Sequence, residues 1–212
     1  MVDNYHLPYA AVFPENSEVK NPVQPIFFLH GYSSNMVSRA DLVSFLDTQN
    51  YCYFFVNAPN RLPGESDLPA FRWYEYQDDD YQDELLQSTE KLELTIDHIC
   101  KTYNFLSEDI ILAGFSQGGM MAIHVAINGR HVFKSVAGFS VLIESEPSTS
   151  KASIKFFISQ GLNDPIFAPK FGQYTRDTLE HAGHTVVYKE YDMAHEINME
   201  CLADFSNWVT SL

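Results

Sequence analysis

The chain has 212 residues, 45% of them hydrophobic and 19% charged, and these proportions exclude a disordered tail and predict one domain over residues 1–212. Its 13 Lys and Arg residues against 28 Asp and Glu residues give a net charge of −15 with neutral His. A surface of that sign repels polyphosphate backbones and anionic lipid headgroups, so we expect no nucleic-acid partner.

Seven apolar segments rich in β-branched and aromatic residues recur along the chain, and each predicts a β-strand. In chain order they are Ala10–Phe13, Ile26–Leu29, Tyr53–Val56, Ile110–Phe115, Ser135–Phe139, Ile154–Ile158 and Val186–Tyr191. Several are apolar throughout instead of alternating, which is typical of strands that helices cover on both faces. Helical segments lie between most of them, so we expect an open α/β sheet.

Five segments with helical spacing of apolar residues predict the helices. Ser38, with Asp41 three residues later, indicates a capping box at the start of the first. Leu42, Phe45 and Leu46 are expected on its buried side. Three further helices are expected at about Tyr81–Tyr103, from Ser116 or Gln117 to near Gly129, and at about Pro169–Ala182. A last helix is expected near the C-terminus, where Met199, Leu202, Phe205 and Val209 stand at helical spacing.

Residues 60–80 break this alternation of strands and helices. They include Pro63, Gly64, Pro69 and the aromatic residues Phe71, Trp73, Tyr74 and Tyr76. A segment of this length without periodicity in a compact domain is usually a working loop, and its aromatic content argues against disorder. We expect this aromatic loop to lie near a functional site, and it is too short to form a separate lid domain.

The strongest local signal is the sequence Gly114-Phe115-Ser116-Gln117-Gly118-Gly119. It follows a predicted strand and opens a predicted helix, which is the context that a G-x-S-x-G nucleophile elbow requires. Side chains at Gly114 and Gly118 would collide across so tight a turn. Ser116 is then pushed out at the carboxyl edge of the sheet as an accessible nucleophile. A glycine-rich structural turn is the alternative.

A serine nucleophile needs a base within hydrogen-bond reach and a carboxylate that orients the base. In sheets of this type the acid and then the histidine follow the serine, on loops after later strands. Asp164 lies just past the predicted strand Ile154–Ile158, and His195 lies just past Val186–Tyr191. Both are then expected at the edge of the sheet that carries Ser116, where open α/β folds bind their ligands.

Alternatives to this assignment lie in the same two loops. Asp164 stands in an Asn-Asp-Pro turn, where an aspartate can simply bond its own backbone. Asp192 is the second candidate acid, but three residues from His195 it is poorly placed to face the imidazole. Among the eight histidines, His195 alone stands in a loop of the required kind.

Negative charge on the carbonyl oxygen of a tetrahedral intermediate needs preorganised donors, usually two backbone N–H groups. The segment Leu29-His30-Gly31-Tyr32 leaves a predicted strand and turns at its glycine. We expect the N–H groups of Tyr32 and Gln117 to be these donors. His30, early in the chain, is expected to fix the loop instead of acting as a base.

Taken together, these motifs resemble the phospholipase/carboxylesterase family, the small serine hydrolases similar to acyl-protein thioesterases. The resemblance rests on Leu29-His30-Gly31, Ala58-Pro59-Asn60-Arg61, Trp73, the hexapeptide Gly114–Gly119, Gly161 with Asp164, and His195-Glu196, and it covers nearly the whole chain. It implies an α/β-hydrolase fold with a mostly parallel sheet, helices on both faces and no large cap domain. It also implies cofactor-free hydrolysis of carboxylic esters or thioesters, an acyl groove beside the aromatic loop, and catalytic positions for Ser116, Asp164 and His195.

Three positions depart from the family pattern. Tyr32-Ser33-Ser34-Asn35 follows His-Gly where the family usually has Leu-Gly-Asp, Ala194 precedes the histidine where glycine is common, and Pro169 stands one place later than usual after Asp164. None of these removes a reacting group. They leave the natural substrate open.

Two further clusters have both a functional and a structural interpretation. Trp73, Phe71 and Tyr74 are expected to contact substrate in an acyl pocket, with pinning of the loop to the body as the alternative. Acidic residues at 78–80, with Asp83 and Glu84, suggest a divalent-cation site. Acids at the start of a long helix also complement its dipole, so we expect no metal.

The sequence therefore predicts a serine carboxylesterase that hydrolyses short- to medium-chain carboxylic esters through an acyl-enzyme on Ser116. Thioesters and lysophospholipids are further candidate substrates. An acyltransferase or peptidase with the same triad, and a catalytically silent binding module with this fold, are the alternatives. No cofactor is expected.

The chain start, Met1–His6, lacks the basic and apolar stretches of a secretory signal, and no window approaches the ~20 apolar residues that span a bilayer. Cys52, Cys100 and Cys201 are far apart in apolar surroundings, which indicates reduced thiols. We expect a cytoplasmic protein without membrane insertion that acts on a small-molecule substrate as a monomer or homodimer.

Overall fold

The computed structural model describes residues 6–15, 23–38, 40–64, 68–76, 81–143 and 152–212. Its strands are β1 (Tyr9–Val12), β2 (Gln24–Leu29), β3 (Tyr51–Val56), β4 (Asn60–Arg61), β5 (Phe71–Arg72), β6 (Ile111–Phe115), β7 (Ser135–Phe139), β8 (Lys155–Gly161) and β9 (Thr185–Tyr191). The seven predicted strands correspond to β1 to β3 and β6 to β9. The short antiparallel pair β4 and β5, inside the aromatic loop, was not predicted.

The predicted helices are also present, with one exception. The α-helices are α1 (Tyr81–Tyr103), α2 (Gln117–Asn128), α3 (Pro169–His181) and α4 (Met199–Thr210), and two short 3₁₀ helices are η1 (Ala40–Phe45) and η2 (Ser107–Asp109). The four α-helices match four of the predicted segments. The exception is η1, for which an α-helix was expected, and the short helix η2 was not predicted.

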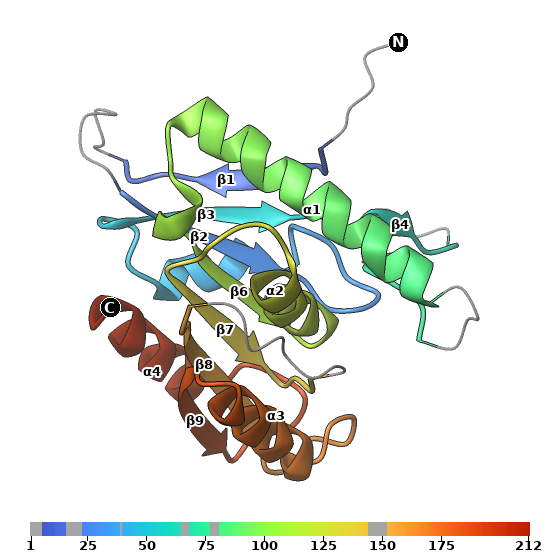
Figure 1. The fold of residues 1–212 in the computed structure, drawn as a ribbon, viewed down its shortest axis with the longest axis vertical. Helices are drawn as coiled ribbons and strands as arrows, with labels where there is room; N and C mark the ends of the chain where they lie inside the picture. The colour runs from blue at the N-terminus through green and yellow to red at the C-terminus, as the bar shows by residue number, and fades with distance from the viewer. Residues whose placement is uncertain (1–5, 16–22, 39, 65–67, 77–80, 144–151) are drawn as a thin grey trace.

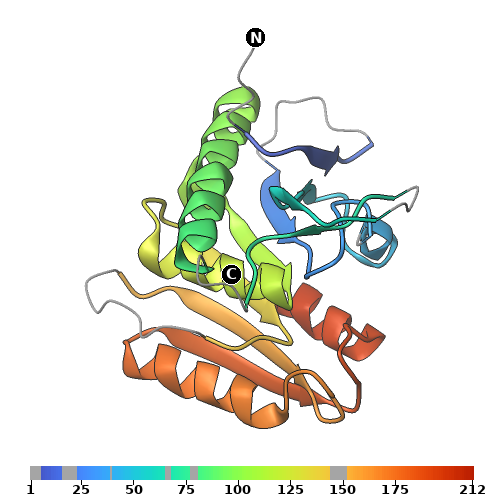
Figure 2. The same cartoon turned by 90° about the vertical axis from the view of Figure 1, so that its right-hand side faces the viewer.

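The seven long strands form one sheet in the order β1-β3-β2-β6-β7-β8-β9 (Figure 1). The edge strand β1 pairs antiparallel with β3, and every other neighbouring pair is parallel. Helices α1, α2 and α3 cover one face of the sheet, and α4 with η1 covers the other (Figure 2). The predicted α/β architecture, with helices on both faces of a mostly parallel sheet, is confirmed.

Each strand contributes to two hydrophobic cores because its side chains alternate between the faces of the sheet. On β2, for example, Phe27 and Leu29 pack toward α1 and α2, whereas Ile26 and Phe28 pack toward α4. All four side chains are buried. Burial on both faces explains why inner strands such as β3 and β6 are almost entirely apolar.

The first predicted helix is wrong in type and in part of its buried side. It is a six-residue 3₁₀ helix, and Phe45 is 58% exposed, although Leu42 and Leu46 pack against the core as expected. A 3₁₀ helix this short presents a narrow side to the sheet, which leaves no buried place for the phenyl ring. Ser38 lies in a turn before this helix, in which its hydroxyl donates to the Asn35 carbonyl at 2.6 Å, and the predicted capping box with Asp41 stays a prediction. The Asp41 side chain lies outside the described residues.

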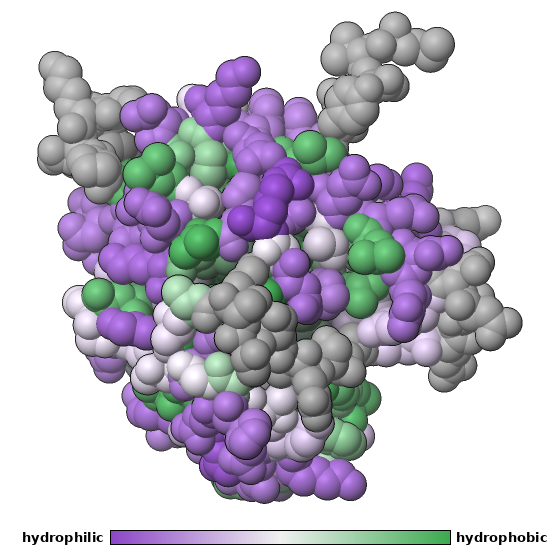
Figure 3. Space-filling model, in the orientation of Figure 1, coloured by the Kyte–Doolittle hydropathy of each residue, from purple (hydrophilic) through white to green (hydrophobic). Residues whose placement is uncertain are grey.

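The surface over α1, α2 and α3 is largely hydrophilic, with apolar side chains in small separate patches (Figure 3). Within the described part of the chain, no helix combines the length and the apolar character that crossing a membrane requires. Cys52 and Cys201 are buried free thiols and Cys100 is a partly buried one, as expected.

Candidate active site

Ser116 stands at the turn between β6 and α2, with a left-handed φ of 52°. A Cβ atom on Gly114 would lie 2.4 Å from the backbone of Gly118, and a Cβ on Gly118 would lie 2.3 Å from the carbonyl oxygen of Leu29. Both distances are too short for any side chain. The predicted need for two glycines is therefore confirmed. Gly114 lets the end of β6 approach the start of α2, and Gly118 lets α2 start directly against the end of β2.

The three residues predicted to act together meet at the carboxyl edge of the sheet. His195 Nε2 lies 3.0 Å from Ser116 Oγ, and His195 Nδ1 lies 2.8 Å from Asp164 Oδ2. Because Nδ1 faces a carboxylate, it carries the ring proton, and Nε2 is left to accept a hydrogen bond from the serine hydroxyl. The loops after β6, β8 and β9 thus build an aligned chain of hydroxyl, imidazole and carboxylate.

The Asp164 carboxylate is held by four hydrogen bonds. Its Oδ1 accepts from the N–H groups of Ile166 and Phe167, both at 2.8 Å. Its Oδ2 accepts from His195 and, at 3.2 Å, from the side-chain amide of Gln160. Burial raises the pKa of Asp164, but hydrogen bonds from Phe167, His195 and Ile166 outweigh burial and hold the pKa below its ordinary value. The group is therefore a carboxylate at neutral pH.

Gln160 is a site residue that sequence reasoning missed. It is fully buried at the end of β8, and its Nε2 donates to the Phe167 carbonyl as well as to Asp164. Its Oε1 has no hydrogen-bond partner among the described residues. A glutamine that follows the apolar run Phe156–Ile158 at the end of a strand, four residues before the candidate acid, was the signal that could have found it.

The acid loop and the histidine loop lie directly against each other. A Cβ on Gly161 would lie 2.3 Å from the carbonyl oxygen of Ala194, and the N–H of Asn163 donates to the Met193 carbonyl at 3.1 Å. The second candidate acid, Asp192, is exposed and accepts a hydrogen bond from the Asn163 side chain at 2.6 Å. The structure therefore brings Asp164, and not Asp192, to the imidazole.

The backbone segments expected to stabilise an oxyanion also lie beside Ser116. Gln117 is the first residue of α2, so its N–H belongs to the helix end whose amides have no intrahelical acceptor. A Cβ on Gly31 would lie 3.4 Å from the Cβ of Ser116, which places the chain leading to Tyr32 against the nucleophile.

His30 has the structural role that the sequence indicated. It is 1% exposed, its Nε2 accepts the N–H of Ala58 at 2.9 Å, and its Nδ1 lies 2.8 Å from the Gly31 carbonyl. These contacts require a neutral ring with the proton on Nδ1. The imidazole thus joins the loop after β2 to the loop after β3.

The aromatic loop is pinned to the elbow by the Gln117 side chain. The N–H of Trp73 donates to Gln117 Oε1 at 2.9 Å, and Gln117 Nε2 donates to the Tyr74 carbonyl at 2.7 Å. The Trp73 indole also donates to the His30 carbonyl at 2.9 Å. Trp73 and Tyr74 are completely buried, so they hold the loop in place, which is the structural alternative that the sequence left open.

A groove of about 390 Å³ opens at Ser116. Its lining residues are Gly31, Tyr32, Glu75, Tyr76, Phe115, Ser116, Ile166, Phe167 and His195. The sequence predicted an aromatic loop at this place, and the loop contributes Glu75 and Tyr76. Sequence reasoning did not predict that Ile166 and Phe167, the apolar residues that closely follow Asp164, also line the groove.

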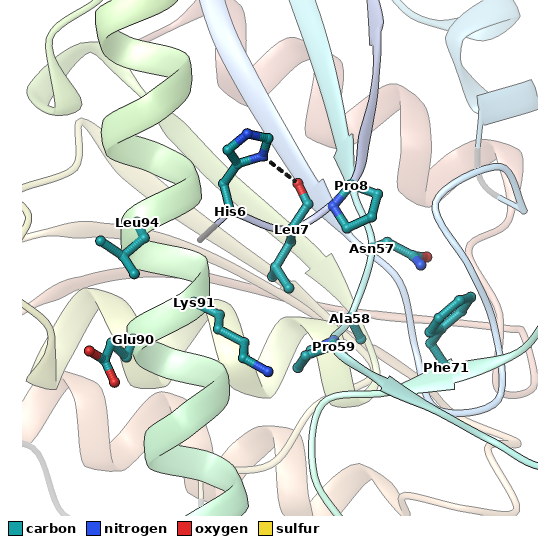
Figure 4. Close-up of a pocket in the computed structure, with 10 residues that line it drawn as sticks. All are labelled: His6, Leu7, Pro8, Asn57, Ala58, Pro59, Phe71, Glu90, Lys91 and Leu94. Carbon is teal, nitrogen blue, oxygen red and sulfur yellow. Dashed lines mark hydrogen bonds between the residues drawn. The ribbon is translucent and has the colours of Figure 1, made fainter. Parts of the chain in front are cut away.

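Phe71 lines a different cavity, of about 490 Å³, between the N-terminal segment, the chain after β3 and α1 (Figure 4). There the Lys91 side chain extends from α1 toward Pro59, and Asn57 lies near Phe71 (Figure 4). None of the residues in the hydroxyl–imidazole–carboxylate chain lines this cavity. Thus none of the three aromatic residues expected to contact substrate lines the groove at the serine.

The candidate metal site receives no support from the described residues, among which no group of three or more His, Cys, Asp or Glu side chains could hold an ion. Residues 78–80 lie outside them. Glu84 instead accepts hydrogen bonds from Arg72 at 2.9 Å and from the N–H of Glu75 at 2.8 Å.

A mostly parallel sheet with a serine elbow, an imidazole and a buried carboxylate at its carboxyl edge defines the class, an α/β-hydrolase of the serine hydrolase superfamily. Within that class, the family model for phospholipase/carboxylesterase matches residues 10–212. The chain therefore belongs to the phospholipase/carboxylesterase family, and the resemblance in its motifs is confirmed.

Curated relatives include acyl-protein thioesterase 1 from Debaryomyces hansenii, 28% identical, with 87% of this chain and 89% of that protein covered. Acyl-protein thioesterase 1 from Mycosarcoma maydis is 26% identical, with 76% and 77% covered. Among solved structures, a carboxylesterase from Mesorhizobium loti has a TM-score of 0.83 at 17% identity, covering 100% of this chain and 98% of that one. Acyl-protein thioesterase 2 from Zea mays has a TM-score of 0.72 at 21% identity, covering 97% and 99%. These likenesses show the α/β-hydrolase fold without a large cap domain.

Proposed function

We propose that the protein is a serine carboxylesterase that hydrolyses short- to medium-chain carboxylic esters through an acyl-enzyme on Ser116. Thioesters and lysophospholipids are substrates of the same chemistry. The observation that carries the proposal is the hydrogen-bond chain from Ser116 Oγ to His195 Nε2, 3.0 Å, and from His195 Nδ1 to Asp164 Oδ2, 2.8 Å.

In the first half-reaction, Ser116 Oγ attacks the ester carbonyl while His195 Nε2 takes the hydroxyl proton. Asp164 stabilises the imidazolium that forms and keeps the ring in the productive orientation. The N–H groups of Tyr32 and Gln117 donate to the oxyanion of the tetrahedral intermediate. His195 then gives its proton to the leaving alcohol, and the acyl group stays on Ser116.

In the second half-reaction, His195 removes a proton from a water molecule, which attacks the acyl-enzyme. Collapse of the second tetrahedral intermediate returns the proton to Ser116 Oγ and releases the carboxylic acid. Each step uses only groups of this chain and water.

The groove supports an acyl substrate of modest size. Phe115, Ile166 and Phe167 form an apolar wall beside the serine, and the volume of about 390 Å³ lies at the lower end of small-molecule sites. An acyl chain along this wall gains hydrophobic stabilisation with each methylene it buries. This supports short to medium acyl chains as the preferred substrates.

Hydrolysis of p-nitrophenyl esters of increasing acyl length tests the proposal. We expect kcat/KM to rise with chain length and then fall once the wall is filled, and we expect Ser116→Ala to lose turnover. Parallel assays with thioesters, with peptides and with an added alcohol acceptor separate the esterase from a peptidase or acyltransferase. Absence of ester turnover in the intact protein would contradict the proposal and favour a binding module.

A further inference from the structure

One wall of the groove at Ser116 carries a fixed negative charge, the carboxylate of Glu75. The Tyr32 hydroxyl donates to Glu75 Oε2 at 3.0 Å, and the N–H of Tyr76 donates to Glu75 Oε1 at 3.0 Å. The side chain is 29% exposed, so it is both held in position and open to the groove. Among the described residues that line the groove, Glu75 alone is an Asp, Glu, Lys or Arg.

Arg72 does not neutralise this charge by itself. Its Nη2 lies 2.9 Å from Glu84 Oε1, whereas its Nε lies 3.6 Å from Glu75 Oε2. One guanidinium is thus shared between two carboxylates and makes its closer contact with Glu84. This leaves a negative potential on the side of the groove where Glu75 lies.

Aromatic side chains flank the carboxylate on the same wall. Tyr32 is 40% exposed and Tyr76 is 41% exposed, and both line the groove. The Tyr76 hydroxyl contacts Met120 Sδ at 3.1 Å, and its ring packs edge-on against Tyr74 at 5.2 Å, so the ring is fixed. Aromatic faces beside a carboxylate attract organic cations, whose weak hydration makes them easy to desolvate. Ile166 and Phe167, which line the same groove, are apolar.

We propose, building on the esterase function above, that the groove selects esters whose alcohol part carries a positive charge, such as esters of quaternary amino alcohols. The cationic group lies against Glu75 between the two tyrosines, and the acyl chain lies along Ile166 and Phe167. Ser116 attacks the carbonyl between them. Hydrolysis consumes one water and yields a carboxylic acid and the cationic alcohol, which takes the proton from His195 as it leaves.

The test compares butyrylcholine with neohexyl butyrate, in which a carbon atom replaces the quaternary nitrogen and only the charge differs. We expect wild-type kcat/KM to favour the cationic ester by about fivefold, the effect of one partly exposed ion pair with aromatic contacts. The ratio of kcat/KM for the cationic ester to kcat/KM for the neutral ester should approach one in Glu75→Gln. It should also approach one for the wild type in about 1 M salt, which screens the charge. Glu200→Gln, which removes an exposed carboxylate at the start of α4, should keep the preference. A wild-type preference of one or less, or a preference unchanged in Glu75→Gln, overturns the proposal.

Two further measurements separate this proposal from the esterase function on which it rests. Turnover of p-nitrophenyl butyrate, an uncharged ester, measures the activity of the triad independently of the cation site. Its absence would count against the esterase function and not against the cation site. Calorimetric titration of Ser116→Ala protein with tetramethylammonium needs no turnover, and we expect saturable binding that the Glu75→Gln change abolishes. Absence of such binding overturns the cation site. If Glu75→Gln does not fold, as judged by circular dichroism, the loss of the wild-type preference in high salt decides the question.

Discussion

At the scale of single residues, the orientation of one imidazole determines the chemistry. His195 is fixed by the carboxylate at Nδ1 and by ring contacts with Phe115 and Phe167, whose centroids lie 4.9 and 5.6 Å away. Asp164 in turn is fixed by two backbone N–H groups and by Gln160. Each group is therefore held by at least two partners, which is the preorganisation that general-base catalysis needs.

Replacement of Asp164 by asparagine tests this arrangement. We expect Asp164→Asn to lower kcat for p-nitrophenyl butyrate by about 10³- to 10⁴-fold, because a neutral amide favours the wrong tautomer and does not stabilise the imidazolium. KM should change little, since the carboxylate does not line the groove. The matched control is Asp192→Asn, an exposed acid in the neighbouring loop, which should keep nearly full activity. Equal losses in the two variants would contradict the assignment of the acid.

At the scale of elements, glycines let the loops of the site approach one another. Gly118 brings the start of α2 against the end of β2, and Gly161 brings the acid loop against the histidine loop. In both places the atoms that a side chain would meet belong to backbone. The site therefore depends on contacts between main-chain segments as well as on its reacting side chains.

Gly161→Ala should separate these two loops. Its Cβ would lie 2.3 Å from the Ala194 carbonyl oxygen, next to His195, so backbone must move before the methyl group fits. We expect kcat to fall at least about tenfold, because misplacement of catalytic groups by about 1 Å costs that much or more, and Tm to fall as well. Gly64→Ala is the matched control, since a Cβ there meets nothing within 4 Å. Unchanged kcat in Gly161→Ala would show that the loops tolerate displacement.

The sequence predicted the long strands and helices well, but it did not predict the short elements or the buried side chains of the aromatic loop. Long strands were predictable because burial on two faces leaves an unbroken apolar run, and long helices because burial along one stripe leaves a helical period. The strands β4 and β5 have two residues each, too few for any pattern, and η1 has six, too few for the spacing of apolar residues to distinguish a 3₁₀ helix from an α-helix. Asp164 and His195 were predictable because each directly follows a strand. The burial of Trp73 and Tyr74 was not, because their backbone is held by hydrogen bonds with the side chain of Gln117, far away in the chain.

At the scale of the whole molecule, acidic groups govern stability in acid. Among the described residues, three aspartates have a pKa below the ordinary value: Asn50 donates to Asp47, Lys189 pairs with Asp204, and backbone and imidazole donors outweigh burial at Asp164. A lowered pKa in the folded state adds stability that is present above the unfolded-state pKa. This stability is lost as the pH falls through the folded-state pKa.

We therefore expect the free energy of unfolding to fall steeply as the pH drops below about 4, near the ordinary pKa of aspartate. Urea titrations at a series of pH values measure this dependence. Asp164→Asn should show a shallower acid dependence than the wild type, because it lacks one of the three groups. A free energy of unfolding that stays constant down to about pH 2 would contradict the lowered pKa of these aspartates in the folded state.

The most direct measurement of the central claim is mass spectrometry of the intact protein after treatment with a fluorophosphonate, which reacts with activated serine hydroxyls. We expect one adduct per chain, located by peptide mapping to the segment that contains Ser116, with labelling slowed strongly in Asp164→Asn and absent in Ser116→Ala. An intact, folded protein that acquires no adduct, or acquires it on another serine, would contradict the assignment of Ser116 as the nucleophile.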